Sequence, residues 1–162
     1  MFQVGDKIVY PMHGAGVIED IQEKEILGNK QLYYVVTIGN MQVMFPTEAK
    51  ISIRPVVDVA IVEDVLSSTF QEEVSESSLS HSQRYRMNMN RMKSGDIYEG
   101  AQVIRDLVRI AAKRSLTTGD RSMLDNARQI FVSELALVMG IDQEEAKELL
   151  EEALESPCAE SC

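Results

Sequence analysis

The first third of the chain alternates short apolar runs with turn signals. The runs are rich in β-branched and aromatic residues, which favours strand over helix. Gly28-Asn29 and Gly39-Asn40 suit the tight turns of β-hairpins, because such turns need positive φ angles. The pattern predicts strands at residues 7–10, 16–21, 32–38, 41–46 and 51–56. Strands this short and this closely spaced predict a strongly bent sheet or a partly open barrel.

From about residue 56 onward the apolar positions recur at helical spacing. Residues 58–70 read as an acidic amphipathic helix, and residues 71–82, rich in serine and glutamate, predict a linker or loosely ordered loop. Asp96 and Thr117 begin helices, Gly140 ends one, and Asp142 caps a last acidic helix that runs to about residue 154. The apolar faces of the two central helices contain Ile97, Ala101, Ile104, Leu107, Val108 and Ala111, and then Met123, Ala127, Ile130, Phe131, Leu135 and Val138. The pattern predicts a compact bundle of three or four helices.

This change in pattern predicts an α+β protein with two domains, residues 1–55 and residues 56–162. The second domain would include the loose segment at about 71–82 and an acidic C-terminal helix and tail. Two dissimilar modules indicate a protein that holds two partners, whereas an enzyme more often shows one pocket with convergent chemistry.

The charge distribution adds a basic region to an acidic chain. The formal net charge is −10, yet residues 84–128 carry ten basic and five acidic residues, a net of +5. Arg105, Arg109 and Lys113 are spaced by four and would share one helix face. Arginine predominates, which suits contact with phosphates, and no residue set predicts base-specific reading. The alternative is that these charged side chains only cover the solvent-exposed faces of the helices and bind no partner.

The residues that could carry catalysis or bind a metal are few and scattered. His13 and His81 lie far apart in the sequence, and no nucleophile, base and orienting group accompany them. His13-Gly14-Ala15-Gly16 lacks the third glycine of a phosphate loop and opens onto a strand, so we interpret its glycines as turn or close-packing residues. Cys158 and Cys162 supply two ligands, where a closed zinc site needs four. We therefore expect no enzyme, metal or cofactor.

The start of the chain lacks the basic residues and long apolar run of a signal peptide. No stretch approaches the roughly 18 apolar residues of a membrane helix. These features predict a cytoplasmic protein.

Several different short motifs follow one another along residues 2–140. The motifs lie at residues 4–16, 84–85, 94–96, 103–107, 123–130 and 133–137. Their sequence, order and spacing resemble the CarD/CdnL family of bacterial transcription regulators. The resemblance implies a Tudor-like first domain, similar to the polymerase-interacting module of the transcription-repair coupling factor, followed by a helical bundle.

The resemblance also implies partners. The first domain would dock on the lobe/protrusion region of the RNA polymerase β subunit, partly by pairing an exposed strand with a strand of β. The helical domain would contact promoter DNA, largely independently of sequence, at the upstream edge of the melted bubble and stabilise the open complex. The protein would be a monomer associated with the nucleoid through the polymerase, with a dimer or domain swap through an exposed edge strand as an alternative.

Individual positions follow from the same resemblance. Lys24 corresponds to a basic residue at the polymerase contact, and Met44, followed by Phe45 and Pro46, stands where some members have a second arginine. The resemblance places Arg84 and Arg86 in the family's DNA-facing stretch. With His81 and the basic residues singled out by charge, the predicted DNA-binding residues are His81, Arg84, Arg86, Arg105, Arg109, Lys113, Arg114 and Arg121.

One position departs from the family pattern. Well-studied members have a tryptophan that wedges into the minor groove at the bubble edge, and His81 takes its place here in a chain without tryptophan. An imidazole buries less apolar area than an indole, which predicts weaker bubble stabilisation or activity dominated by polymerase and phosphate contacts. A polymerase-bound adaptor with weak or lost DNA binding is the second hypothesis.

Overall fold

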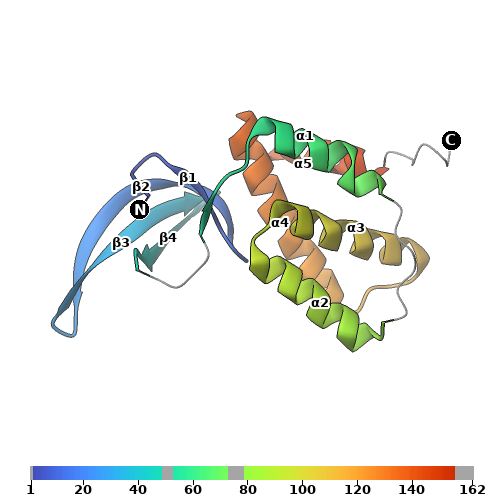
Figure 1. Cartoon of the computed structure of the whole chain (residues 1–162), viewed down its shortest axis with the longest axis horizontal. Helices are drawn as coiled ribbons and strands as arrows, with labels where there is room; N and C mark the ends of the chain where they lie inside the picture. The colour runs from blue at the N-terminus through green and yellow to red at the C-terminus, as the bar shows by residue number, and fades with distance from the viewer. Residues whose placement is uncertain (1, 49–52, 73–78, 156–162) are drawn as a thin grey trace.

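The computed structural model describes residues 2–48, 53–72 and 79–155. It confirms the α+β class: an antiparallel sheet is followed by a bundle of helices (Figure 1). The sheet has the order β4-β3-β2-β1-β5. Its strands are β1 (Lys7–Tyr10), β2 (Gly14–Ile26), β3 (Asn29–Ile38), β4 (Met41–Pro46) and β5 (Arg54–Pro55).

The β2–β3 hairpin is longer than the sequence pattern predicted. The two strands pair out to Ile26 and Asn29, so the turn residues are Leu27 and Gly28, with φ angles of 52° and 80°. The predicted turn at Gly28-Asn29 is therefore wrong by one residue, whereas the predicted turn at Gly39-Asn40 is confirmed by the pairing of Ile38 with Met41. The extension was missed because both of its faces are exposed and no alternating pattern marks it. Of the strand predicted at 51–56, residues 51 and 52 lie outside the described residues.

The inner face of the sheet buries a small core, and Gly16 lies at its most crowded point. The core is formed by Ile8, Ile18, Tyr34, Val36, Ile38 and Phe45. A Cβ atom placed on Gly16 would collide with the carbonyl oxygen of Thr37 and lie 2.9 Å from side-chain carbons of Val36 and Ile38. The interpretation of Gly16 as a close-packing glycine is confirmed.

We expect Gly16→Ala to lower the free energy of unfolding by about 2 kcal/mol, because the added methyl group overpacks a backbone that cannot move aside. Gly100→Ala is the matched control, since a Cβ on Gly100 meets nothing within 4 Å. Urea unfolding followed by circular dichroism measures both variants. Equal midpoints for the two would contradict the crowding at Gly16.

The helical part of the described chain contains five α-helices and a short 3-10 helix. They are α1 (Val59–Ser67), η1 (Thr69–Gln71), α2 (His81–Ser94), α3 (Ile97–Lys113), α4 (Thr118–Met139) and α5 (Gln143–Glu155). Asp58, Asp96 and Thr117 cap α1, α3 and α4 through their side chains, and Gly140 ends α4 with a left-handed conformation. None of the described helices is long and apolar enough to cross a membrane.

Helix α2 is the main difference from the predicted bundle. A loose segment was predicted at 71–82. Of these residues, 73–78 lie outside the described residues, and the predicted segment ends too late because α2 already begins at His81. Ser80 and Gln83 form a capping box at its start. The helix was not delimited from sequence because its residues are mostly polar, with only Asn88 and Met92 fully buried.

The core of the bundle lies between α3 and α4. Of the positions predicted for the apolar face of α3, Ile97, Ala101, Ile104 and Leu107 are buried, and Ala111 is exposed. The hydroxyl of Tyr98 on α3 donates a 2.8 Å hydrogen bond to Asp64 on α1, and this bond raises the pKa of Tyr98. The bundle is thus closed by packing and by polar contacts at its surface.

The sheet and the bundle meet along α4. The turn between β1 and β2 carries Met12, whose side chain packs against the helical core and whose φ angle is 72°. The backbone N–H of Ala15 donates a 2.8 Å hydrogen bond to the hydroxyl of Ser133 on α4. The β2–β3 hairpin extends away from this junction, and α2 lies on the side of the bundle opposite α1 (Figure 1).

Candidate functional site

Strand β4 forms one edge of the sheet, and its side chains alternate between two faces. It pairs with β3, and no other described strand pairs with it. Phe45 is buried and its ring lies 4.7 Å from that of Tyr10, so it belongs to the core. Met44 and Pro46 point to the other face, and Met44 is exposed. Of the predicted contact residues on this strand, Phe45 can therefore act only through its backbone.

Lys24 lies on the same outer face as Met44 and Pro46. Pro46 stands opposite Tyr33, which stands opposite Gln22 on β2, and Lys24 follows two residues later. Two residues along a strand correspond to about 7 Å. The structure thus brings Lys24, Met44 and Pro46 to one face of the sheet, with Met44 and Pro46 on the edge strand and Lys24 on β2, separated from that edge by β3.

The described basic residues of the second domain separate into exposed and internal ones. Arg86 on α2, Arg114 at the end of α3 and Arg121 on α4 are exposed. Arg84 is half-buried, and its Nε atom is buried without a hydrogen-bond partner. Lys113 is exposed and has an interaction of its own within the protein.

Arg105 and Arg109 are used inside the protein. Arg105 is only 3% exposed, and its Nε donates a 2.9 Å hydrogen bond to Asp106 while Nη1 reaches the carbonyl oxygen of Thr69. Arg109 donates a 2.6 Å hydrogen bond to the carbonyl oxygen of Glu72. These arginines hold the segment after α1 against α3. The predicted basic face of Arg105, Arg109 and Lys113 is therefore not a uniform exposed surface.

A hollow of about 420 Å³ lies where α2 and α4 begin. His81, Arg84, Arg114, Thr117 and Asp120 line it. Both helices start here, so backbone N–H groups and two arginines face the same region, which suits an anion such as a phosphate. Arg84 and Arg114 line this hollow, whereas the exposed Arg86 on α2 and Arg121 on α4 lie outside its lining. We refer to Arg84, Arg86, Arg114 and Arg121 together as the arginine surface.

His81 is attached to the start of α4. Its Nε2 lies 3.1 Å from the hydroxyl of Thr117 and 3.2 Å from a carboxylate oxygen of Asp120, which is buried. Its ring stacks against Tyr85 at a centroid distance of 6.4 Å. His81 is therefore the first residue of a helix, and its side chain has partners on α4 although it remains exposed.

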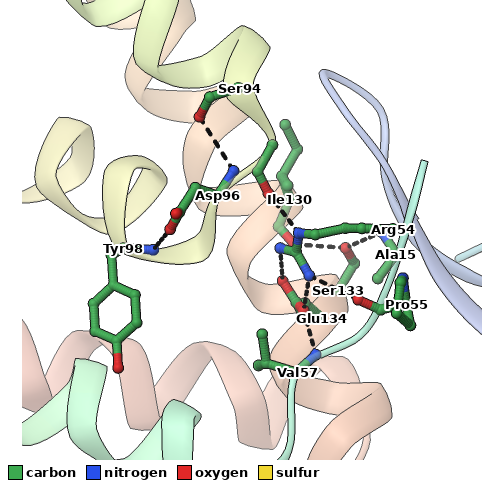
Figure 2. A network of polar contacts seen from close by, with 11 residues as sticks. Ala15, Arg54, Pro55, Val57, Ser94, Asp96, Tyr98, Ile130, Ser133 and Glu134 are labelled. Atoms are coloured by element: carbon green, nitrogen blue, oxygen red, sulfur yellow. Dashed lines mark hydrogen bonds and ion pairs between the residues drawn. The ribbon is translucent and has the colours of Figure 1, made fainter. Parts of the chain in front are cut away.

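The residues that join the two domains were not singled out from the sequence. Arg54 on β5 forms two hydrogen bonds of 2.7 Å with the carboxylate of Glu134 on α4 (Figure 2). Glu134 also accepts a 3.0 Å hydrogen bond from the backbone N–H of Val57. The available signal was a single carboxylate in the apolar stretch of α4, where a charge must find a partner.

Comparison with known proteins finds two family matches along the chain. Residues 2–57 match the family described as CarD-like/TRCF RID domain, and residues 64–151 match CarD, C-terminal domain. The chain belongs to the CarD/CdnL family. It is 46% identical over 151 residues to the Bacillus subtilis (strain 168) protein named "Putative transcription factor YdeB", an alignment that covers 91% of this chain and 98% of the relative.

In this CarD/CdnL protein the two family domains carry different surfaces. The sheet offers an exposed edge and the outer face with Lys24, and the bundle offers the arginine surface. Within the described residues no group of three or more histidine, cysteine, aspartate and glutamate side chains could hold a metal ion. The chemistry that the geometry supports is binding at two separate places.

Proposed function

We propose that this protein is a transcription regulator that binds the RNA polymerase β subunit and promoter DNA together. The outer face and free edge of the sheet would dock on the lobe/protrusion of β, with a strand of β pairing to β4. The arginine surface would contact phosphates at the upstream edge of the bubble and stabilise the open complex. The protein would act by binding, in the cytoplasm, and without catalysis.

The observation that carries the proposal is the free edge of β4 in a chain of this family. An unpaired strand edge presents a row of backbone donors and acceptors to a partner strand. Lys24 is exposed on the same face of the sheet, on β2 and one strand away from β4, where a cation can contact an acidic side chain of a partner. Met44 adds exposed apolar area in place of a second cation.

The contribution to DNA binding would come from phosphate contacts. His81 faces Thr117 and Asp120, and this attachment does not favour insertion between base pairs. The exposed arginines remain available for phosphates and would supply affinity that depends on salt and little on sequence.

A polymerase-bound adaptor with weak or lost DNA binding is the second candidate. It is favoured by the absence of a wedge-like tryptophan and by the use of Arg105 and Arg109 inside the protein. The two candidates share the polymerase contact and differ in whether free promoter DNA binds with a measurable salt dependence.

We expect Lys24→Glu to weaken binding to a purified fragment of the β lobe and protrusion by at least about tenfold, because the reversed charge would face the carboxylate that the lysine pairs with. Biolayer interferometry with the immobilised fragment measures the change. Lys147→Glu on α5 is the matched control, since it makes the same charge change on the other domain and should bind like the wild type. Absence of wild-type binding would refute the polymerase contact, and equal binding by the Lys24 variant would remove Lys24 from it.

A further inference from the structure

Three parts of the molecule are joined by one arginine side chain. Arg54 lies on β5, its Nη atoms bond to Glu134 on α4, and its Nε donates a 2.6 Å hydrogen bond to the carbonyl oxygen of Gly95. Gly95 ends α2, the helix that carries Arg84 and Arg86. A residue of the sheet domain therefore contacts the end of the helix that bears part of the arginine surface.

The geometry of this contact is fixed on both sides. Glu134 is 1% exposed, and its Oε2 also accepts a hydrogen bond from the N–H of Val57, at the start of the connection to α1. The planar guanidinium of Arg54 donates to two carboxylate oxygens and to the carbonyl oxygens of Gly95 and Pro55 at once, which restricts both distance and angle. We call Arg54, Glu134 and Gly95 the domain bracket.

A second contact holds the same interface across β1, since Ala15 on β2 and Arg54 on β5 both stand opposite Val9, on either side of that strand. The N–H of Ala15 bonds to the hydroxyl of Ser133, and Gly14 lies so close that a Cβ there would be 3.0 Å from the same hydroxyl. Ser133 and Glu134 are consecutive residues of α4, so one turn of this helix holds both β2 and β5. Two separate attachments prevent rotation of the sheet about a single point.

We infer that the domain bracket is a positioning device, which fixes the orientation of α2 relative to the polymerase-facing sheet. This inference rests on the proposed function. A protein that binds polymerase and DNA in one complex gains from the second contact only if both surfaces reach their partners together. The bracket sets that geometry before binding, so little orientational freedom is lost when the complex forms.

The inference predicts different effects on binding to each partner alone and on the complex that contains both partners. Loosening the bracket leaves the β-facing sheet and the arginine surface unchanged, because Arg54 and Glu134 belong to neither. Binding of the isolated β fragment and of free duplex DNA therefore stays within about twofold of the wild type. The lifetime of the open complex, which depends on both contacts at once, falls by at least about fivefold.

The variant that tests this is Arg54→Lys, which keeps the positive charge and removes the two-pronged geometry and the bond to Gly95. Arg128→Lys is the matched control: Arg128 on α4 likewise forms a 2.7 Å ion pair, but with Glu151 on α5 inside the helical domain. Glu134→Gln is the second variant, to be used if Arg54→Lys does not fold, because glutamine can still accept the hydrogen bond from Val57.

Domain orientation is measured separately by pulsed electron resonance between spin labels at Glu23→Cys on β2 and Lys147→Cys on α5, with Cys158 and Cys162 replaced by serine. We expect the distribution of distances between the two spin labels to be broader in Arg54→Lys than in Arg128→Lys. We also expect the shorter open-complex lifetime in Arg54→Lys. An unchanged distribution would overturn the inference, as would a broader one with a wild-type lifetime. If the wild-type protein does not prolong the open complex at all, the proposed function fails. The width of the distance distribution between the spin labels still decides whether the domain bracket orients the two domains.

Discussion

Replacement of Glu134 by alanine is expected to lower the free energy of unfolding by about 3 kcal/mol. The carboxylate accepts hydrogen bonds from Arg54 and from the N–H of Val57, and its position inside the interface keeps water from taking over all of these bonds. Removing one partner of a buried pair leaves the other charge uncompensated, which costs more than the pair itself contributes. The missing side chain also leaves a gap beside the core of the bundle.

The matched control is Glu151→Ala. Glu151 forms an ion pair of the same 2.7 Å length with Arg128, but both side chains are about one-third exposed. Pairs of this kind contribute about 0–1 kcal/mol, so this control should lie close to the wild type. Thermal unfolding should separate the two variants by about 6–12 °C for a chain of this size. Equal midpoints would show that burial of Glu134 does not matter to stability.

Replacement of Arg84, Arg86 and Arg121 by glutamine is expected to weaken binding to free promoter DNA about 100-fold near 0.1 M salt. Each phosphate that a protein neutralises releases counterions and contributes about 0.9 to the slope of log affinity against log salt concentration. Three lost contacts should therefore make this slope shallower by about 2.7. Fluorescence anisotropy of a labelled duplex, titrated at several salt concentrations, measures affinity and slope together.

The control for this variant removes the same number of charges elsewhere. Lys24, Lys30 and Lys147 are exposed and lie outside the arginine surface, so their replacement by glutamine should change the slope by much less than one unit. A triple-lysine variant that matches the triple-arginine variant would indicate that only net charge matters. If the wild type shows no salt-dependent binding, the adaptor alternative replaces the proposal of a DNA contact.

The elements predicted correctly from the sequence are those marked by turn, cap and apolar-repeat residues within the element itself. The turn at Gly39-Asn40 follows a strand of β-branched and aromatic residues, and helix α4 combines the Thr117 cap, an apolar repeat and Gly140 at its end. Each of these signals lies within a few residues of the structure that it specifies. The family resemblance gave Lys24 and Met44 as contact positions, and the structure places both on one face of the sheet, although the strand predicted at 16–21 did not reach Lys24.

Other features depend on contacts between distant residues and leave no local trace. Arg105 fits a basic helix face by its spacing from Arg109, and only its packing against Thr69 and Asp106 shows that it is internal. Arg54 and Glu134 are 80 residues apart. Their pairing depends on how the sheet and the bundle meet, which periodicity in either domain does not specify.

The domain bracket also restricts which single substitutions this chain can accept. A substitution at Arg54 alone leaves the buried carboxylate of Glu134 without its cation, and a substitution at Glu134 alone leaves the arginine and the N–H of Val57 without their acceptor. Either intermediate carries the cost of a buried, uncompensated charge. Residues 54 and 134 are therefore expected to change together, and a sheet domain with a different residue at position 54 is expected to pack less stably on this bundle.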